Sequence, residues 1–257
     1  MFSTGFSFEL GELRMSILSS SKLGPLSLGF PTLDDVFPGF EPGDFTVLQG
    51  NVASSMIFAL SVRAQLPRGN GGLDSSTVFV DGGNSFSPYE VSESARDYGL
   101  DCKAALERVY VSRAFTAYQL SSLILEKLRS VLRKTRARLL IVSDVASLFL
   151  DRDIPKTEGR ELFMKVCSKL SEIASEKRVI VVASYFPEGQ SRQGMFFEAV
   201  LFGKADVLVR LRRKGQVLTV ALEDHPRIRP FSMDFTADPP VTRVFGGVCF
   251  GEDRSVL

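Results

Sequence analysis

The chain has 257 residues, of which 44% are apolar and 24% charged, so it can bury the core of one large domain or two small ones. Its formal net charge of +1 excludes a global electrostatic attraction to nucleic acid or membranes, so any basic patch has to be local. It has three widely spaced cysteines, one histidine and no apolar run of about 18 residues. These features predict a cytoplasmic protein without a disulfide framework, metal site or membrane span.

The N-terminal segment, residues 1–23, begins with a loose alternation of polar and apolar residues. Its aromatic members include Phe2, Phe6 and Phe8, and aromatics at a spacing of two favour a strand. Two interpretations remain open. The segment is an edge strand of its own domain, or it inserts these phenylalanines into a groove or sheet edge of a neighbouring chain.

The first element expected in the core is a strand over residues 45–49, which Gly50 ends. Before it, Thr32 is placed to cap a short helix over residues 33–36. After it, a loop of small residues precedes an apolar helix that we expect to begin at Met56.

Strands and helices then alternate along the chain. Ser87 and Pro88 mark the start of a helix. Thr116 and Gln119 form a capping box that opens a long helix, and a third helix presents its apolar face from Leu162 onward. Such alternation predicts a mostly parallel sheet with helices on both faces. The further strands expected are residues 77–81, 109–111, 139–142 and 179–183.

From residue 205 the pattern changes to antiparallel pairing. Residues 206–212 and 216–222 read as two strands joined at Lys214 and Gly215, which is a hairpin signal. A further strand is expected near residues 241–250. The sheet is therefore predicted to finish antiparallel.

The turn after the first strand has the layout of a P-loop, whose pattern is G-x-x-x-x-G-K-[ST]. Counted from Gly50, the second glycine becomes Ser55, the lysine becomes Met56 and the hydroxyl residue becomes Ile57. The frame of a phosphate-binding loop is present without the side chains that hold phosphate and Mg²⁺. The residues of this vestigial loop are Gly50, Asn51, Ser54, Ser55, Met56 and Ile57.

Several other short segments stand in a specific order around this loop. They are residues 33–35 with 40–43, 64–67, 79–88, 98–101, 111–115 and 139–149. In this order they resemble the ATPase core of the RecA/RadA recombinases, especially the archaeal RadA type and its paralogues.

The resemblance covers residues 24–222 and implies one RecA-like three-layer α/β domain over residues 1–257. Its central sheet would be mostly parallel with an antiparallel C-terminal hairpin. Residues 1–23 would be an N-terminal extension and residues 223–257 a C-terminal strand and tail.

The resemblance also assigns the remaining catalytic positions. Gly83 stands where the family has a catalytic glutamate, Ser143 where it has the Walker B aspartate, and Tyr185 where it has a sensor glutamine. Asp144 follows Ser143, but successive strand residues point to opposite faces. We therefore predict a pseudo-ATPase with no catalytic residue and no cofactor.

Basic residues offer a possible weak contact with DNA. The hairpin is basic, and the loops that contact DNA in the family correspond to residues 151–159 and 187–203, where acidic residues offset the basic ones. The alternative for the basic hairpin is a solvated turn that binds no ligand. A second basic run, from Lys127 to Arg138, is explained by the preference for cations at a helix C-terminus. The candidate DNA-contacting residues are Arg192, Lys204, Arg210, Arg212, Arg213 and Lys214.

The run from Met195 through Phe196 and Phe197 to Phe202 is unusually apolar. If exposed it would be a binding surface, and if folded inward it would be a helix packed on the sheet. Together with the N-terminal phenylalanines, Met195, Phe196 and Phe197 are the candidate partner-binding residues.

The sequence thus predicts a catalytically inactive RecA/RadA-like paralogue. It would act as a protein-binding or regulatory partner in DNA recombination or repair, with a recombinase homologue or as a homo-oligomer. Two alternatives remain open: a DNA-binding module that uses the basic hairpin and loops, and a residual ATPase or nucleotide sensor completed by a partner subunit.

Overall fold

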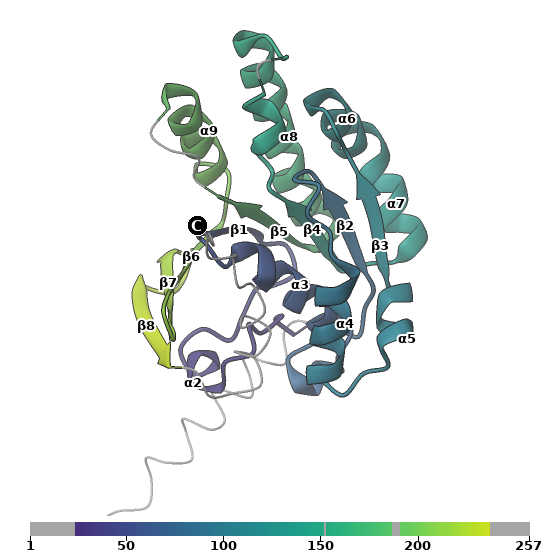
Figure 1. Cartoon of the computed structure of the whole chain (residues 1–257), viewed down its shortest axis with the longest axis vertical. Helices are drawn as coiled ribbons and strands as arrows, with labels where there is room; N and C mark the ends of the chain where they lie inside the picture. The colour runs from purple at the N-terminus through teal and green to yellow at the C-terminus, as the bar shows by residue number, and fades with distance from the viewer. Residues whose placement is uncertain (1–23, 152, 187–190, 237–257) are drawn as a thin grey trace, which may run out of the picture.

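The computed structural model describes residues 24–151, 153–186 and 191–236. Eight strands form one sheet in the order β3-β2-β4-β5-β1-β6-β7-β8, with helices on both of its faces (Figure 1). The predicted N-terminal strand with Phe2, Phe6 and Phe8, and the strand expected near residues 241–250, lie outside the described residues.

The parallel half of the sheet confirms the strands expected from apolar runs. All pairings between these strands are parallel. Four of the five strands are fully buried because helices cover both of their faces, whereas β3, at the edge, is largely exposed. The strands are β1 (Phe45–Gln49), β2 (Thr77–Asp81), β3 (Val109–Arg113), β4 (Leu139–Ser143) and β5 (Ile180–Tyr185).

The antiparallel half begins with β6 (Val207–Lys214), which pairs in parallel with β1 and antiparallel with β7 (Val217–Asp224). This is the predicted hairpin. A further strand, β8 (Phe231–Thr236), pairs antiparallel with β7 and was not predicted. Alternate residues of β8, such as Phe231 and Phe235, pack against the core from a partly exposed strand.

The helices form two layers, one on each face of the sheet, and each layer has its own apolar core. One core joins one face of the sheet to α2, α3, α4 and α5, and the other joins the opposite face to the remaining helices. The first group is α2 (Pro31–Asp34), α3 (Ala53–Arg63), the short 3-10 turn η1 (Arg68–Asn70), α4 (Pro88–Asp97) and α5 (Cys102–Glu107). The second group is α6 (Ala117–Ser122), η2 (Leu123–Lys127), α7 (Leu128–Thr135), η3 (Ser147–Phe149), α8 (Lys156–Lys177) and α9 (Arg192–Phe202).

The first residues of the helices test the predicted N-cap residues. Ser87 and Thr116 cap α4 and α6 through their side chains, as predicted. The prediction for Thr32 is wrong, because α2 begins at Pro31, whose fixed φ suits the first helical position. The long helix predicted after Thr116 is interrupted by η2, one turn of π-helix.

The apolar run after residue 195 is helix α9, which packs mainly against α8. Phe197 is fully buried, with its ring 4.6 Å from that of Phe163 and 6.2 Å from that of Phe149. The prediction that Phe197 faces a partner is therefore wrong. Phe196 is partly buried, and Met195 is 54% exposed.

None of the helices in the described part of the chain is long and apolar enough to span a lipid bilayer.

Gly50 allows the turn from β1 into α3 to be tighter than predicted. The helix begins at Ala53, three residues before the expected start at Met56. Gly50 has a φ of +116°, and a Cβ built on it would lie 2.0 Å from the carbonyl oxygen of Leu211 in β6. Only glycine fits this position, since both the backbone conformation and the space exclude a side chain.

We expect Gly50→Ala to lower the free energy of unfolding by at least about 2 kcal/mol, because the added methyl group meets a backbone atom that cannot move aside cheaply. Urea denaturation measures the change. Gly69→Ala is the control, since Gly69 has open space around its Cβ position. Equal stability of the two variants would contradict the tight contact between the turn and β6.

Candidate functional site

The predicted site residues meet at the carboxyl edge of the parallel strands. Gly50 follows β1, Gly83 follows β2, Asp144 follows β4, and Tyr185 ends β5. Ligands of open α/β sheets bind at this edge. Gly50 lines two separate hollows at this edge. The one between β1 and β5 measures about 190 Å³ and is walled by Gly50, Ala53, Ser54, Asp144, Ser184, Tyr185 and Phe186. The other, of about 490 Å³, lies beside β6, and a third, of about 370 Å³, lies beside Gly83 and Asp144.

The loop after β1 is tied to β6 and not left open. The Asn51 side chain donates from Nδ2 to the Arg213 carbonyl oxygen at 3.0 Å and accepts from the Arg213 backbone N–H at 2.9 Å. The Gly50 N–H donates to the Tyr185 carbonyl oxygen, and the Ala53 N–H donates to that of Gly50. A phosphate-binding loop directs such N–H groups at its ligand, whereas these are already used within the fold.

Met56 and Ile57 are fully buried and belong to the core beneath α3. The sequence predicts that the family's P-loop lysine and Mg²⁺-binding hydroxyl residue would stand at these two positions. Of the other vestigial loop residues, Ser54 is exposed and Ser55 is half-buried. The side chains that would contact a nucleotide in a P-loop therefore contribute to the apolar core.

A buried carboxylate that the sequence analysis did not single out organises the same edge. Asp81, at the end of β2, is fully buried and accepts four hydrogen bonds. The donors are the hydroxyl of Ser143 at 2.9 Å, the N–H groups of Ser85 and Phe86 at 2.9 and 3.1 Å, and Arg113 Nε at 3.0 Å. The hydroxyl of Ser143, the residue predicted at the Walker B position, is thus engaged with Asp81. An acidic residue at the end of a buried strand was the available signal.

Asp144 and Gly83 are sterically linked. Asp144 adopts a left-handed conformation, with φ of 45°, and its N–H donates to the Ser184 hydroxyl at 2.9 Å. A Cβ built on Gly83 would lie 2.8 Å from the Cβ and 3.2 Å from Oδ2 of Asp144. A glutamate at position 83 would not fit beside Asp144 as it is placed.

Tyr185 fills the space between β5 and α9. It is 3% exposed, its hydroxyl donates to Glu198 Oε2 at 3.3 Å, and its ring meets the Phe202 ring edge-on at 6.0 Å. Its role in these contacts is to pack α9 against the sheet.

The six candidate DNA-contacting residues do not form one cluster. Arg210 and Arg212 are exposed on the same face of β6, as predicted, but Arg210 is paired with Glu223 at 2.8 Å. Arg192 is the first residue of the 11-residue α9, and Lys204 lies two residues beyond its end, so the length of the helix, roughly 16 Å at 1.5 Å per residue, separates them. In the hairpin, the side chains of Arg212 and Lys214 are exposed and could contact a ligand.

Within the described ranges, no three His, Cys, Asp or Glu side chains are grouped so that they could hold a metal ion. The histidine, His225, accepts the backbone N–H groups of Arg227 and Ile228 through Nδ1, each at 3.0 Å. Burial lowers the pKa of His225, which favours the neutral ring that these bonds require.

The parallel sheet, the strand–turn–helix after β1 and the antiparallel extension define the fold of a RecA-like ATPase core. A comparison with protein families matches residues 22–199 to the Rad51 family. The chain therefore belongs to the Rad51 family, which confirms the resemblance to recombinase cores. This membership associates the chain with DNA recombination and repair. The matched segment ends within α9, so β6, β7 and β8 lie beyond it.

We expect Met56→Lys, which restores the family lysine, to destabilise the fold by about 3–5 kcal/mol, because it buries an uncompensated charge in the core. Met56→Leu is the matched control and should cost less than about 1.5 kcal/mol. Urea denaturation of both variants gives the comparison. If the lysine variant were as stable as the leucine variant, the side chain at position 56 would reach solvent or a phosphate site.

Proposed function

We propose that this chain is a catalytically inactive member of the Rad51 family that acts as a protein-binding or regulatory partner in DNA recombination or repair. The observation that carries the proposal is the burial of Met56 and Ile57 in the apolar core. The proposal also retains the archaeal RadA type, a cytoplasmic location and a homo-oligomer or recombinase homologue as partner.

The energetics of nucleotide binding support this proposal. A nucleoside triphosphate carries several negative charges. Each charge-assisted hydrogen bond to its phosphates contributes about 1.5–3 kcal/mol. A chain without the lysine and the Mg²⁺ ligand lacks both counter-charges. Replacing the general base with Gly83 would by itself cost a factor of about 10²–10⁴ in rate.

An exposed sheet edge supports the partner role. Among the described residues, β3 pairs with β2 alone, so its outer backbone groups face away from the sheet. Tyr110 and Val111 on β3, and Phe115 and Tyr118 just after it, are 40–63% exposed. An unpaired edge beside exposed aromatics suits the addition of a strand from a second Rad51-family chain. The N-terminal phenylalanines remain a prediction for the inserted segment.

The first test is isothermal calorimetry with Mg·ATP up to millimolar concentration. We expect no saturable heat, because the counter-charges for the phosphates are missing. ATP turnover should be absent when the chain is alone and unchanged when it is mixed with an active Rad51-family enzyme. That enzyme by itself is the positive control for both assays.

Saturable binding by the chain alone would overturn the inactive site and favour a nucleotide sensor. Turnover that rises only in the mixture would favour the alternative of an ATPase completed by a partner.

We expect Val111→Lys to weaken self-association, or association with a purified Rad51-family recombinase, by at least about tenfold, because a charge on an edge strand opposes strand addition. Light scattering coupled to size exclusion measures both. Tyr89→Lys is the matched control, since Tyr89 is 85% exposed and lies on α4, not on the edge strand. Equal loss in both variants, or in neither, would contradict the role of the β3 edge.

A further inference from the structure

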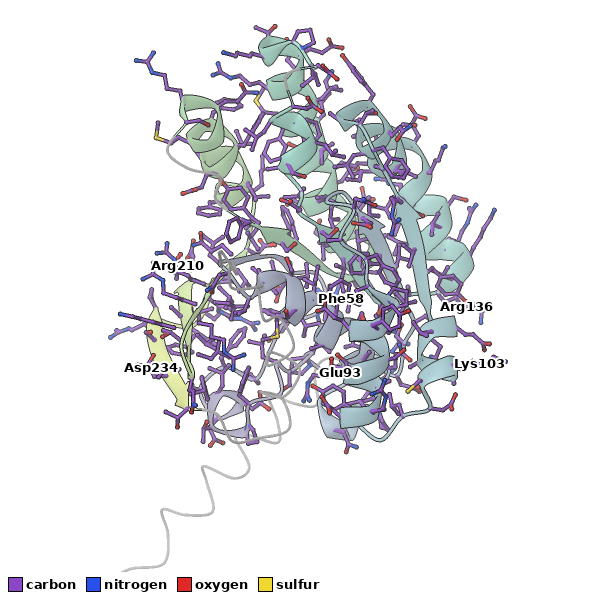
Figure 2. The ribbon with its side chains drawn as sticks, viewed as in Figure 1. Phe58, Glu93, Lys103, Arg136, Arg210 and Asp234 are labelled. Carbon is purple, nitrogen blue, oxygen red and sulfur yellow. The ribbon has the colours of Figure 1, made fainter. Side chains whose placement is uncertain are left out.

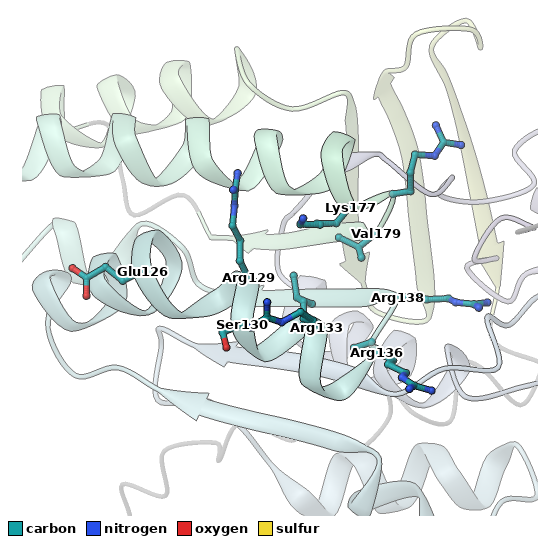
Figure 3. A pocket seen from close by; sticks show the side chains of 11 residues that line it. Glu126, Arg129, Ser130, Arg133, Arg136, Arg138, Lys177 and Val179 are labelled. Atoms are coloured by element: carbon teal, nitrogen blue, oxygen red, sulfur yellow. The ribbon is translucent and has the colours of Figure 1, made fainter.

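A groove of about 610 Å³ lies at the ends of α7 and α8, outside the site described above (Figure 3). It is formed where the chain enters β4 and β5, at the amino edge of the parallel strands. The Ile180 N–H donates to the Arg138 carbonyl oxygen at 2.9 Å, which holds the two entering loops side by side. The vestigial nucleotide site lies at the opposite, carboxyl edge.

The groove is strongly basic. Its charged lining includes a single acidic residue, Glu126, and six cationic residues. One of the cations, Arg129, is neutralised by Glu172 and Glu176 of α8, and Arg138 donates to the carbonyl oxygen of Leu73 at 3.4 Å. The other four make no ion pair within the part of the chain that the structure describes. The cationic residues are Arg129, Arg133, Arg136, Arg138, Lys177 and Arg178.

The preference for cations at helix C-termini explains only some of these residues. Arg133 and Lys177 lie in the last turns of α7 and α8 and satisfy that preference. Arg136 and Arg178 come directly after the two helices, and each has a left-handed backbone with φ of 53°. Glycine or asparagine normally takes this position, and a larger residue there is strained. Strain maintained at two matching positions points to a function of the two side chains.

The lining also indicates which anion fits. Five of the six cations are arginines, whose planar guanidinium groups match the oxygens of phosphate. The apolar floor consists of Leu132, Ala137 and Val179, with no aromatic ring on which a base could stack. Figure 3 shows Arg129 reaching from α7 toward α8, with Lys177 and Val179 across from Arg133. With a volume of about 610 Å³, the groove has room for a short stretch of one phosphodiester strand.

We propose that this groove binds the phosphodiester backbone of a single nucleic-acid strand, without reading its bases. The site is distinct from the basic hairpin, because Arg136 and Arg210 lie on opposite sides of the molecule (Figure 2). It goes beyond the proposed partner function and does not depend on it.

The test is fluorescence anisotropy of a labelled 20-nucleotide oligothymidylate at a series of salt concentrations. The main variant is Arg136→Gly with Arg178→Gly, because glycine suits both left-handed positions and should preserve the melting temperature. We expect affinity at least about tenfold below wild type. The slope of log affinity against log salt should be shallower by about 1.4, since each lost phosphate contact removes about 0.7.

The matched control is Arg212→Gln with Lys214→Gln, which removes two exposed charges from the hairpin and should leave the affinity unchanged. If the glycine variant lowers the melting temperature, Arg133→Gln with Lys177→Gln removes two groove charges within the helices and should give the same loss.

Three results would overturn the proposal. They are no binding of oligothymidylate by the wild type at low salt, a loss of affinity in the hairpin variant alone, and binding of polyglutamate but not of oligothymidylate. The last result would assign the groove to an acidic protein segment.

Discussion

The buried carboxylate of Asp81 organises the carboxyl edge of the sheet. An isolated ion in a protein interior costs several kcal/mol, and this one is compensated by four donors from β3, β4 and the turn after β2. The same bonds determine what the edge can do. An aspartate at position 143 would place a second carboxylate against Asp81, an arrangement that requires a bound cation or a shared proton. With Ser143 there, the network is complete without either.

The apolar pattern was enough to predict most of the fold. Strands β1, β2, β4 and β5 are each centred on apolar residues and are buried along their whole length, as expected for strands covered on both faces. Strand β8 was missed because it lies at an edge and buries only alternate residues in part. The start of α3 was misplaced because the turn depends on contacts between Asn51 and Arg213, which are 162 positions apart in the sequence.

The candidate site was only partly predictable, for a related reason. The substitutions at Met56, Ile57 and Gly83 can be found from the sequence alone, since a motif specifies residue types at a fixed spacing. The steric link between Gly83 and Asp144 is not visible, because the two residues meet only after β2 and β4 pair. Asp81 was missed because its importance comes from its donors, two of which lie on other strands and two in the turn after β2.

The net charge of the chain does not reveal the local cluster of cations at the amino edge of the sheet. A net charge of +1 is a sum over the whole chain, whereas interactions between exposed charges are screened over about 8–10 Å at physiological salt. Acidic residues beyond that distance cannot cancel the cations at the ends of α7 and α8. Near neutrality therefore excludes long-range attraction to nucleic acid and leaves short-range capture of a phosphate chain open. Family membership directs attention to the carboxyl edge, but the fold does not fix where function lies. Here four cations that make no ion pair among the described residues line one groove at the amino edge.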